Sequence, residues 1–512
     1  MYGGFNMKKV LSSLLVASAA LLLVGCGSSS NKTESSTSTS KTTASSSEVA
    51  SGASQKQEFT DSKELKDSYD VIIVGAGGAG MSAAIQAKEA GANPVIFEKM
   101  PVVGGNTTKS SGGMNASETK FQKEQGIQDS NDTFFNDTLK GGGGTNDKEL
   151  LRYFVDHSAD AIDWLDSMGI TLNNISYSGG ASVKRIHRPA DGSAVGGYLV
   201  KGLTKNVLDR KIPVFLNADV TKINEKDGKV SGVTVQIQGE KKKNISSKAV
   251  VVTTGGFGGN EKMIVKYRPD LKGYVSTNAK GSTGDGIKMI EKLGGQLVAM
   301  DQIQVHPTVV QKDGMLVSET VRGEGGILVN QQGKRFFNEL ETRDKVSAAI
   351  SALPEKYAYI VFDDALASRA KQIDFYKSKG VVVEGKTIEE LAKKIKVPAD
   401  TLKQTIDTWN QDVANKKDPE FGRSTAMDYD LTKAPYYAIQ IAPGIHHTMG
   451  GVKINTNTEV INTKGEVIPG LYAAGEVTGG LHGNNRIGGN AVADIVIFGR
   501  QAGNQSAAYV QK

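Results

Sequence analysis

Three glycines at a fixed spacing and a later carboxylate form the clearest chemical signal in the sequence. Gly75, Gly77 and Gly80 make a G-x-G-x-x-G fingerprint, and Glu98 lies 18 residues after the last glycine. In this arrangement the first glycine permits a tight turn, the second lets the backbone approach a pyrophosphate, and the third lets a helix pack closely on a strand. The carboxylate then accepts a hydrogen bond from a ribose hydroxyl. The spacing predicts a dinucleotide site at a helix N-terminus.

The elements that must position these residues follow in the required order. Residues 69–74 are a short apolar run rich in β-branched side chains, which is typical of a buried parallel strand. Residues 81–90 predict a helix that ends at Gly91, and residues 93–98 predict a second strand that ends in the carboxylate. This is a βαβ unit. Further strands are expected at 249–252 and 470–476, each followed or ended by glycines.

The composition narrows the chemistry. The chain has 512 residues and a single cysteine, so it can form no intrachain disulfide, iron–sulfur cluster or covalent haem attachment, and redox chemistry would need an organic cofactor. The net charge of +6 is small for this length and scattered, which disfavours nucleic-acid binding. The six histidines show no H-x-x-x-H or H-E-x-x-H spacing, so we expect no metal site.

The N-terminus has the pattern of an export signal. Lys8 and Lys9 precede an apolar stretch at 10–24 that is too short to span a bilayer. It ends in Leu-Val-Gly-Cys at 23–26, which resembles the lipobox of bacterial lipoproteins, so we expect residues 1–26 to be a signal peptide and Cys26 to be lipidated. A plain secretory signal with a chance cysteine is the alternative, and Met7 is an alternative start. Residues 27–64, rich in Ser and Thr, predict a disordered tether.

The choice between FAD and NAD depends on the segment after Glu98. Residues 99–107 form a long glycine-containing excursion that resembles FAD-dependent reductases, in which this segment runs along the flavin. Residues 253–259 and 474–476 resemble the other FAD-contacting segments of that group. Because no second G-x-G-x-x-G follows a strand, no separate NAD(P)H site is predicted.

Five further motifs occur in the order seen in soluble fumarate reductases: 304–308, 318–323, 341–344, 446–451 and 485–489. The chain from about 65 to 511 most resembles the flavoprotein part of the flavocytochrome c type. The resemblance implies an α/β fold with a Rossmann-like (GR2-type) FAD-binding domain at 65–300 and 437–512. An inserted α+β capping domain that clamps the substrate would occupy 301–436.

The same resemblance implies an enzyme that reduces fumarate to succinate, with residues in named roles. His446 and Arg486 would hold one carboxylate and His306 with Ser318 the other, with Gln304 also at the substrate. Arg343 would donate the proton, resupplied through Glu319 and Arg322. FAD would be noncovalent, because no histidine lies at 106–112, where membrane-complex relatives attach it. Its expected contacts are Gly75, Ala76, Gly77, Gly78, Ala79, Gly80, Glu98, Lys99, Gly104, Gly105, Asn106, Thr107, Gly112, Gly113, Met114, Asn115, Val220, Thr254, Gly255, Gly256, Asp285, Glu476, Arg486, Gly489, Ala491 and Val492.

Some positions depart from the family pattern. Ser318 stands where relatives generally carry threonine, and Tyr177 and Ser178 fall where apolar residues over the flavin are expected. His187 and His482 are expected to be structural or close to the flavin, and His157 an ordinary packing residue. No haem domain or FMN-binding domain is expected, so a separate flavin- or quinol-linked carrier would supply electrons.

Several functions remain open at this point. The same mechanism on urocanate, cinnamate or methacrylate is the nearest alternative. A flavin dehydrogenase or oxidase running in reverse, and a surface flavoprotein that only carries electrons, are the others. The expected location is the outer face of the cell membrane, held there by the lipid on Cys26.

Overall fold

The computed structural model describes residues 59–512. The predicted signal peptide, Cys26 and the predicted tether up to residue 58 lie outside the described residues. Described structure begins with the short helix η1 (Ser62–Glu64). No helix within 59–512 combines the length and apolar character needed to cross a lipid bilayer.

A six-stranded sheet forms the centre of the nucleotide-binding part. Its order is β19 (Glu459–Ile461), β20 (Val467–Ala473), β10 (Ala249–Val252), β1 (Val71–Val74), β2 (Pro94–Phe97) and β6 (Val214–Phe215), and all pairs except β19–β20 are parallel. Every residue of β1, β2 and β10 is buried, which explains their uninterrupted apolar sequences. The predicted α/β class with a Rossmann-like βαβ unit is confirmed.

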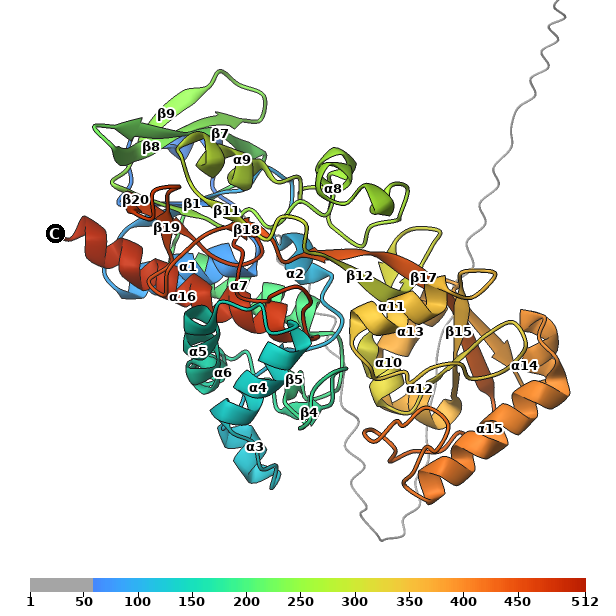
Figure 1. Cartoon of the computed structure of the whole chain (residues 1–512). Coiled ribbons are helices and arrows are strands. Elements are labelled where there is room, and N and C mark those ends of the chain that lie inside the picture. Colours follow the sequence, from blue (N-terminus) through green and yellow to red (C-terminus); the bar gives the residue numbers. More distant parts are fainter. Residues whose placement is uncertain (1–58) are drawn as a thin grey trace, which may run out of the picture. The chain divides into compact units, whose positions relative to one another are not determined.

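Two helices pack against each other on this sheet. α1 (Gly78–Glu89) follows β1 directly, and the C-terminal helix α16 (Asn490–Val510) packs along it (Figure 1). The approach is close because Gly499 and Gly503 face the α1 backbone, where an added Cβ would lie 2.7 Å from Ala79 O and 2.4 Å from Ala83 O. The end of the chain therefore fixes the helix that starts at the glycine fingerprint.

A second, antiparallel sheet forms the inserted part. Its order is β13 (Met315–Leu316), β12 (Ile303–Val310), β17 (Tyr436–Thr448), β15 (Ala358–Asp363) and β14 (Ile327–Val329), and β16 (Val382–Gly385) also pairs with β17. The predicted boundary at residue 437 falls inside β17, so the first residues assigned by sequence to the FAD-binding domain form a central strand of this second sheet. Its helices are α10 (Glu319–Gly323), α11 (Arg343–Ser351), α12 (Asp364–Arg369), α13 (Gln372–Ser378), α14 (Ile388–Ile395) and α15 (Ala399–Ala414).

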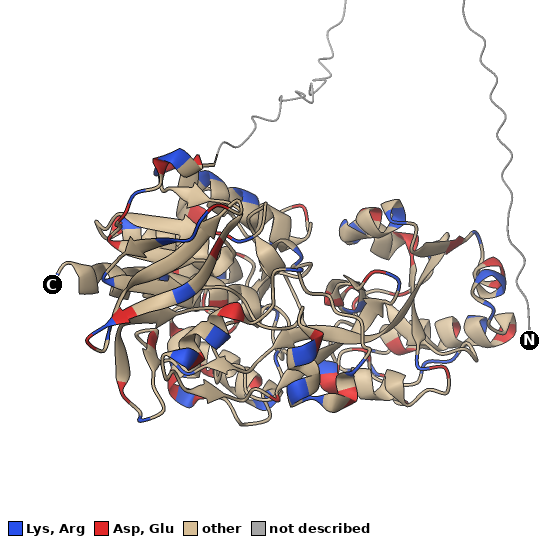
Figure 2. Ribbon diagram, turned by 90° about the horizontal axis from the view of Figure 1, so that it is seen from above, with Lys and Arg blue, Asp and Glu red and all other residues tan. Residues whose placement is uncertain are grey.

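The remaining elements surround the first sheet. There are three small sheets. One has the order β7 (Ala218–Lys226), β8 (Lys229–Ile237) and β9 (Lys243–Ser246), and another has the order β3 (Met114–Asn115), β5 (Ile186–Arg188) and β4 (Asn174–Ser176). In the third, β11 (Leu297–Val298) pairs with β18 (Gly451–Val452). The helices are α2 (Gly105–Thr108), α3 (Lys120–Glu124), α4 (Asn131–Gly141), α5 (Lys148–Asp156), α6 (Ser158–Ser167), α7 (Val195–Asp209), α8 (Glu261–Tyr267), η2 (Pro269–Leu271) and α9 (Asp285–Lys292). Acidic and basic residues are interspersed along these elements (Figure 2), in keeping with the small net charge.

Candidate active site

The glycine fingerprint forms a turn between β1 and α1 that only small residues allow. Gly75 has φ +106°, and a Cβ on it would lie 2.7 Å from Thr253 O. A Cβ on Gly80 would lie 1.9 Å from Gly75 O. Gly77 caps α1 and is open, since the nearest atom to its Cβ position is 3.9 Å away. Gly77, Gly78 and Ala79 line a cavity at the start of α1, where an anionic pyrophosphate fits, and Gly78 N donates to Thr107 Oγ1 at 3.0 Å.

Glu98 lies at the end of β2 beside this turn. Its Oε2 accepts a hydrogen bond from Ala76 N at 2.7 Å, and its Oε1 accepts one from Met100 N at 2.8 Å. Burial raises the pKa of Glu98, while these two backbone donors and the charge of Lys99 lower it. A carboxylate oxygen can accept more than one hydrogen bond, so a ribose hydroxyl can still bind here.

One cavity of about 1400 Å³ connects this turn with the residues predicted to bind substrate. Its volume exceeds the range of about 300–1,000 Å³ usual for a single small-molecule pocket, which fits a dinucleotide together with a small second ligand. The predicted contacts that line it are Gly75, Gly77, Gly78, Ala79, Glu98, Lys99, Gly105, Asn106, Thr107, Gly112, Gly113, Val220, Thr254, Gly255, Asp285, Glu476, Arg486, Gly489, Ala491 and Val492.

Six predicted cofactor contacts do not line the cavity: Ala76, Gly80, Gly104, Met114, Asn115 and Gly256. Their surroundings indicate packing roles instead. A Cβ on Gly256 would lie 2.0 Å from Thr448 Oγ1 and 2.8 Å from Glu476 Oε1. Asn115 donates to Gly488 O at 2.8 Å, so it holds the loop before α16 rather than the ligand.

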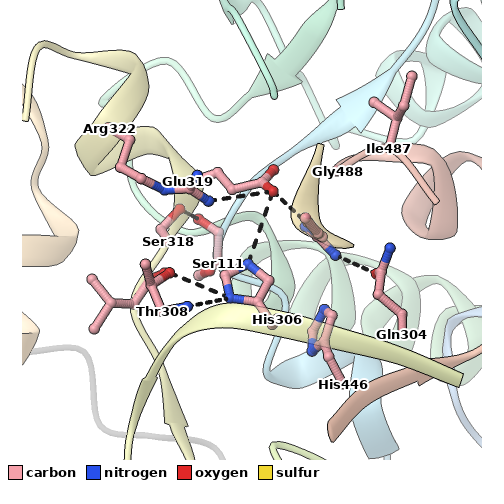
Figure 3. Close-up of polar contacts among 12 residues, drawn as sticks. Ser111, Gln304, His306, Thr308, Ser318, Glu319, Arg322, His446, Ile487 and Gly488 are labelled. Atoms are coloured by element: carbon pink, nitrogen blue, oxygen red, sulfur yellow. Dashed lines mark hydrogen bonds and ion pairs between the residues drawn. The ribbon is translucent and has the colours of Figure 1, made fainter. Parts of the chain in front are cut away.

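A chain of charged side chains ends at the cavity, and Figure 3 shows the contacts of Arg322 and Glu319 within it. Arg343, the first residue of α11, donates from Nε to Glu319 Oε1 at 2.6 Å, and Arg322 Nη2 lies 3.6 Å from the same oxygen. Arg343 and Glu319 line the cavity, whereas Arg322 is fully buried behind them. The order Arg322, Glu319, Arg343 leads from the interior of the second domain to the cavity.

Glu319, Arg322 and Arg486 are ionised at neutral pH. Burial alone would raise the pKa of Glu319, but the charge and hydrogen bond of Arg343 and the charge of Arg322 outweigh it and lower that pKa. Burial lowers the pKa of Arg322 to about 10 against the attraction of Glu319. Burial and the nearby Arg343 charge lower the pKa of Arg486 to about 9. The pKa values of Arg322 and Arg486 are therefore closer to neutral pH than that of an ordinary arginine. Glu319 remains a carboxylate.

Gln304 holds two of the arginines together. Its Oε1 accepts from Arg343 Nη1 at 2.8 Å and from Arg486 Nη2 at 3.2 Å, while its Nε2 donates to Asn485 Oδ1 and Arg486 O. With both ends of the amide in use and no surface in the cavity, Gln304 is a positioning residue. A contact between Gln304 and the substrate stays a prediction.

His306 and His446 face each other with ring centroids 5.1 Å apart, and both line the cavity. Burial first, and then the Arg343 charge, hold the pKa of each well below 6.5, so both are neutral at pH 7. His306 Nδ1 accepts a hydrogen bond from Thr308 N at 3.2 Å, which places the ring proton on Nε2. Among residues 59–512 that buried Nε2 has no hydrogen-bond partner, with Glu319 Oε1 3.9 Å away, so it can donate to a ligand.

Ser318 reaches the cavity but its hydroxyl is occupied. It caps α10 by accepting from Thr320 N at 3.2 Å, and it lies within hydrogen-bond distance of Ser111 O and Thr320 Oγ1. Tyr177 and Ser178, which depart from the family pattern, also line the cavity. The structure thus brings His306, His446, Ser318, Arg343 and Arg486 to one cavity from distant parts of the chain.

Of the four remaining histidines, three lie away from the cavity and one lines it. His187 is buried against Thr119 and Arg185 and does not line the cavity, nor does His482, whose Nε2 lies 3.3 Å from Asp494. His157 stacks on Tyr153. His447 and Tyr376 line the cavity although neither was predicted to belong to the site. His447 follows His446 in its motif and could have been included, whereas no motif surrounds Tyr376.

Comparisons with known proteins agree with this geometry. A family model described as an FAD binding domain matches residues 70–492. An NADH:fumarate oxidoreductase from Klebsiella pneumoniae (strain 342) is 54% identical over 440 residues, covering 86% of this chain and 48% of that protein. A fumarate reductase (cytochrome) from Shewanella frigidimarina is 44% identical over 466 residues, covering 91% of this chain and 81% of that protein.

A solved structure has the same fold. The open conformation of a flavocytochrome c3 fumarate reductase aligns with a TM-score of 0.72 and 43% identity, covering 88% of this chain and 80% of that one. The chain spans about half the length of the Klebsiella relative and about four fifths of the Shewanella relative.

Proposed function

Because the chain belongs to the FAD-dependent fumarate reductase flavoproteins, as the sequence motifs predicted, we propose that it reduces fumarate to succinate. It is an FAD-binding oxidoreductase, and the glycine turn, Glu98 and the helix N-terminus of α1 are the groups that would hold FAD. FAD would be noncovalent, since residues 106–112 include no histidine. When bound and reduced, FAD supplies a hydride from N5 of its isoalloxazine ring.

The observation that carries this proposal is a buried arginine on the cavity wall, Arg486. Arg486 is 4% exposed and forms no ion pair within residues 59–512. Arg343 and Arg322 share the single carboxylate of Glu319. A buried cation without a partner is costly, and a carboxylate ligand removes that cost. A small dianion offers one carboxylate to Arg486 and His446 and a second to the Nε2–H of His306.

The protons follow the chain of charged groups. As hydride reaches one carbon of the double bond, Arg343 gives a proton from its guanidinium to the neighbouring carbon. Glu319, an ionised carboxylate 2.6 Å from Arg343 Nε, then takes a proton from Arg322, 3.6 Å away, and passes it to Arg343. The developing enolate charge is stabilised by the arginines, which are already in position.

The decisive experiment uses the purified FAD-loaded protein with a reduced viologen as electron donor. Wild type is expected to turn over fumarate, and Arg343→Ala to lose about 10²–10⁴-fold in kcat, the range for a lost general acid. Arg152→Ala, which removes a partly exposed arginine on α5 that does not line the cavity, serves as the control. Fumarate turnover by Arg343→Ala close to the wild-type rate would exclude Arg343 as the donor.

The same assay separates the alternative functions. Urocanate, cinnamate and methacrylate are compared with fumarate, and a preferred monocarboxylate would replace the dicarboxylate proposal. Peroxide formed with succinate under air would indicate an oxidase. FAD binding without turnover of any acid would indicate an electron carrier.

We also propose that the protein acts outside the cytoplasmic membrane, anchored by a lipid on Cys26, with a separate carrier reducing its FAD. The support is the signal-like sequence at 1–26 and the lack of a second G-x-G-x-x-G after a predicted strand. The Klebsiella relative is named for NADH, so NADH is the donor to test first. Rapid bleaching of the bound flavin by NADH alone would refute the separate carrier, and failure of Cys26→Ala to abolish fatty-acid labelling would refute the anchor.

A further inference from the structure

Tyr376 is a buried tyrosine of the second domain whose hydroxyl reaches the substrate end of the cavity. It lies on α13, is 1% exposed, and its ring packs in the apolar cluster under β12, β15 and β17. The same side chain lines the cavity together with His306, Ser318 and Ser111. Its oxygen is 2.9 Å from Ser318 N, which places it beside the carboxylate site proposed for His306.

The hydrogen bonds around this oxygen leave its proton unused. Ser318 N donates to the phenolic oxygen at 2.9 Å, and the Ser111 side chain is a further polar neighbour of the hydroxyl. None of the hydrogen bonds formed within residues 59–512 uses the phenolic proton as donor. Burial raises the pKa of Tyr376 to about 12, so the group stays a neutral O–H donor at working pH.

Ser318, by contrast, has no free proton to offer. Its oxygen accepts from Thr320 N as the cap of α10, and its one proton has Ser111 O and Thr320 Oγ1 as neighbours at 3.3 and 3.1 Å. To bind a carboxylate it would have to give up one of these bonds. The two donors that remain at this end are His306 Nε2–H and Tyr376 O–H.

We propose that Tyr376 is a substrate-binding residue that donates a hydrogen bond from its hydroxyl to the carboxylate held by His306, while Ser318 serves mainly to cap α10 and to orient Tyr376 through its N–H. This inference rests on the proposed function, since it assumes a dicarboxylate in the cavity. It assigns one wall of the specificity pocket to α13, an element that carries none of the family motifs.

The test is Tyr376→Phe in the FAD-loaded protein, with Tyr359→Phe as the matched control. Tyr359 is a mostly buried tyrosine of the same domain whose hydroxyl donates to Ile395 O at 3.1 Å and lies outside the cavity. Succinate binding to the oxidised protein is measured by calorimetry, and fumarate reduction by the viologen assay. Retained flavin absorbance and thermal midpoint report that the variants are folded.

Tyr376→Phe is expected to weaken succinate binding and raise KM for fumarate by about 10- to 100-fold, the range for a lost hydrogen bond to a charged group, with a much smaller change in kcat. Tyr359→Phe should bind succinate as wild type does. A folded Tyr376→Phe protein with unchanged succinate affinity overturns the assignment, even if its thermal midpoint falls. Wild type that neither binds succinate nor reduces fumarate would instead overturn the proposed function, so the two failures are distinct.

If Tyr376→Phe loses FAD, Tyr376→Gln provides the second variant. Its amide oxygen can accept from Ser318 N and its NH₂ can donate to a carboxylate. Succinate binding by folded Tyr376→Gln supports the assignment, and no detectable binding at concentrations a hundredfold above the wild-type Kd overturns it.

Discussion

Replacing Gly488 by alanine should disable proton delivery without removing any charged group. Gly488 lies just before α16, and its backbone passes directly over the ion pair of the second domain. A Cβ there would lie 2.0 Å from Glu319 Oε2 and 3.0 Å from Arg343 Nη2. Ordinary contact begins at 3.4 Å, so the Glu319 carboxylate must move by about 1.4 Å. Gly488 is absent from the residues with positive φ, so the effect of alanine is steric alone.

The displacement acts on a bond that has little room to adapt. Glu319 Oε1 is 2.6 Å from Arg343 Nε, both side chains are buried, and Arg343 Nη1 is tied to Gln304 at 2.8 Å. Losing a hydrogen bond between charged groups costs about 1.5–3 kcal/mol, and a misplacement of about 1 Å in an active site can cost about 100-fold in rate. We therefore expect Gly488→Ala to lower kcat for fumarate about 100-fold while FAD and succinate still bind.

The assay is viologen-driven fumarate reduction, with flavin content and succinate affinity measured on the same samples. Gly228→Asn is the control: it lies in the β7–β8 turn with φ +75°, a conformation asparagine tolerates, and nothing lies within 4 Å of its Cβ position. A Gly488→Ala protein that keeps FAD and a kcat within threefold of wild type would show that the Glu319–Arg343 contact does not limit turnover.

Two further outcomes follow from the structure. Gly80→Ala should be purified without flavin, because its Cβ would lie 1.9 Å from Gly75 O and the turn cannot widen; the 450 nm absorbance of the purified protein measures this, and full flavin content would contradict it. The thermal midpoint of the FAD-loaded protein should decrease as the pH is lowered from 7.5 to 5.5. The reason is that burial lowers the pKa of His187 to about 4 and holds the pKa values of His306, His446 and His447 well below 6.5. Between pH 6.5 and these lowered values the unfolded chain binds more protons than the folded one, so each such group removes about 1.4 kcal/mol of stability per pH unit as the pH falls. The carboxyl groups whose pKa burial raises, Glu98, Asp363, Asp412 and Glu476, act in the opposite sense, but the five histidines with a lowered pKa, His482 included, outnumber them. His187→Gln should reduce the pH dependence, and a midpoint that rises on acidification would contradict the sign.

The nucleotide-binding half of the structure could be predicted because its signal is local. β1, the glycine turn, α1 and β2 occupy one continuous stretch, and each glycine has a steric reason that a sequence pattern already contains. What the pattern could not show is that both oxygens of Glu98 accept backbone N–H groups. That contact depends on the excursion after β2 folding back onto the turn.

The substrate end was predictable as a set of residues but not as a set of roles. The order of the motifs predicted that His306, Arg343 and Arg486 share one site, and all three line one cavity. The role of Gln304 follows instead from the register of β12 on β17 and from the loop before α16, which together direct both arginines to one amide oxygen. Tyr376 lies in a helix with ordinary sequence, and only the tertiary packing brings it to Ser318 N.

The groups proposed to deliver the proton and the arginine proposed to hold a substrate carboxylate come from different domains. The reaction therefore depends on how the two domains are positioned. The proton chain is carried by α10 and α11 of the second domain, whereas Arg486 precedes α16, the helix that packs on the helix of the glycine turn. Gln304 on β12 bonds to Arg343 on one side and to Arg486 on the other, so a single amide sets the distance between proton donor and carboxylate clamp. A shift of the second domain by one hydrogen-bond length would therefore break the contact between Gln304 and Arg486. If this amide did not bridge both arginines, the proposed proton donor and the arginine proposed to hold a substrate carboxylate would no longer be held at a fixed distance.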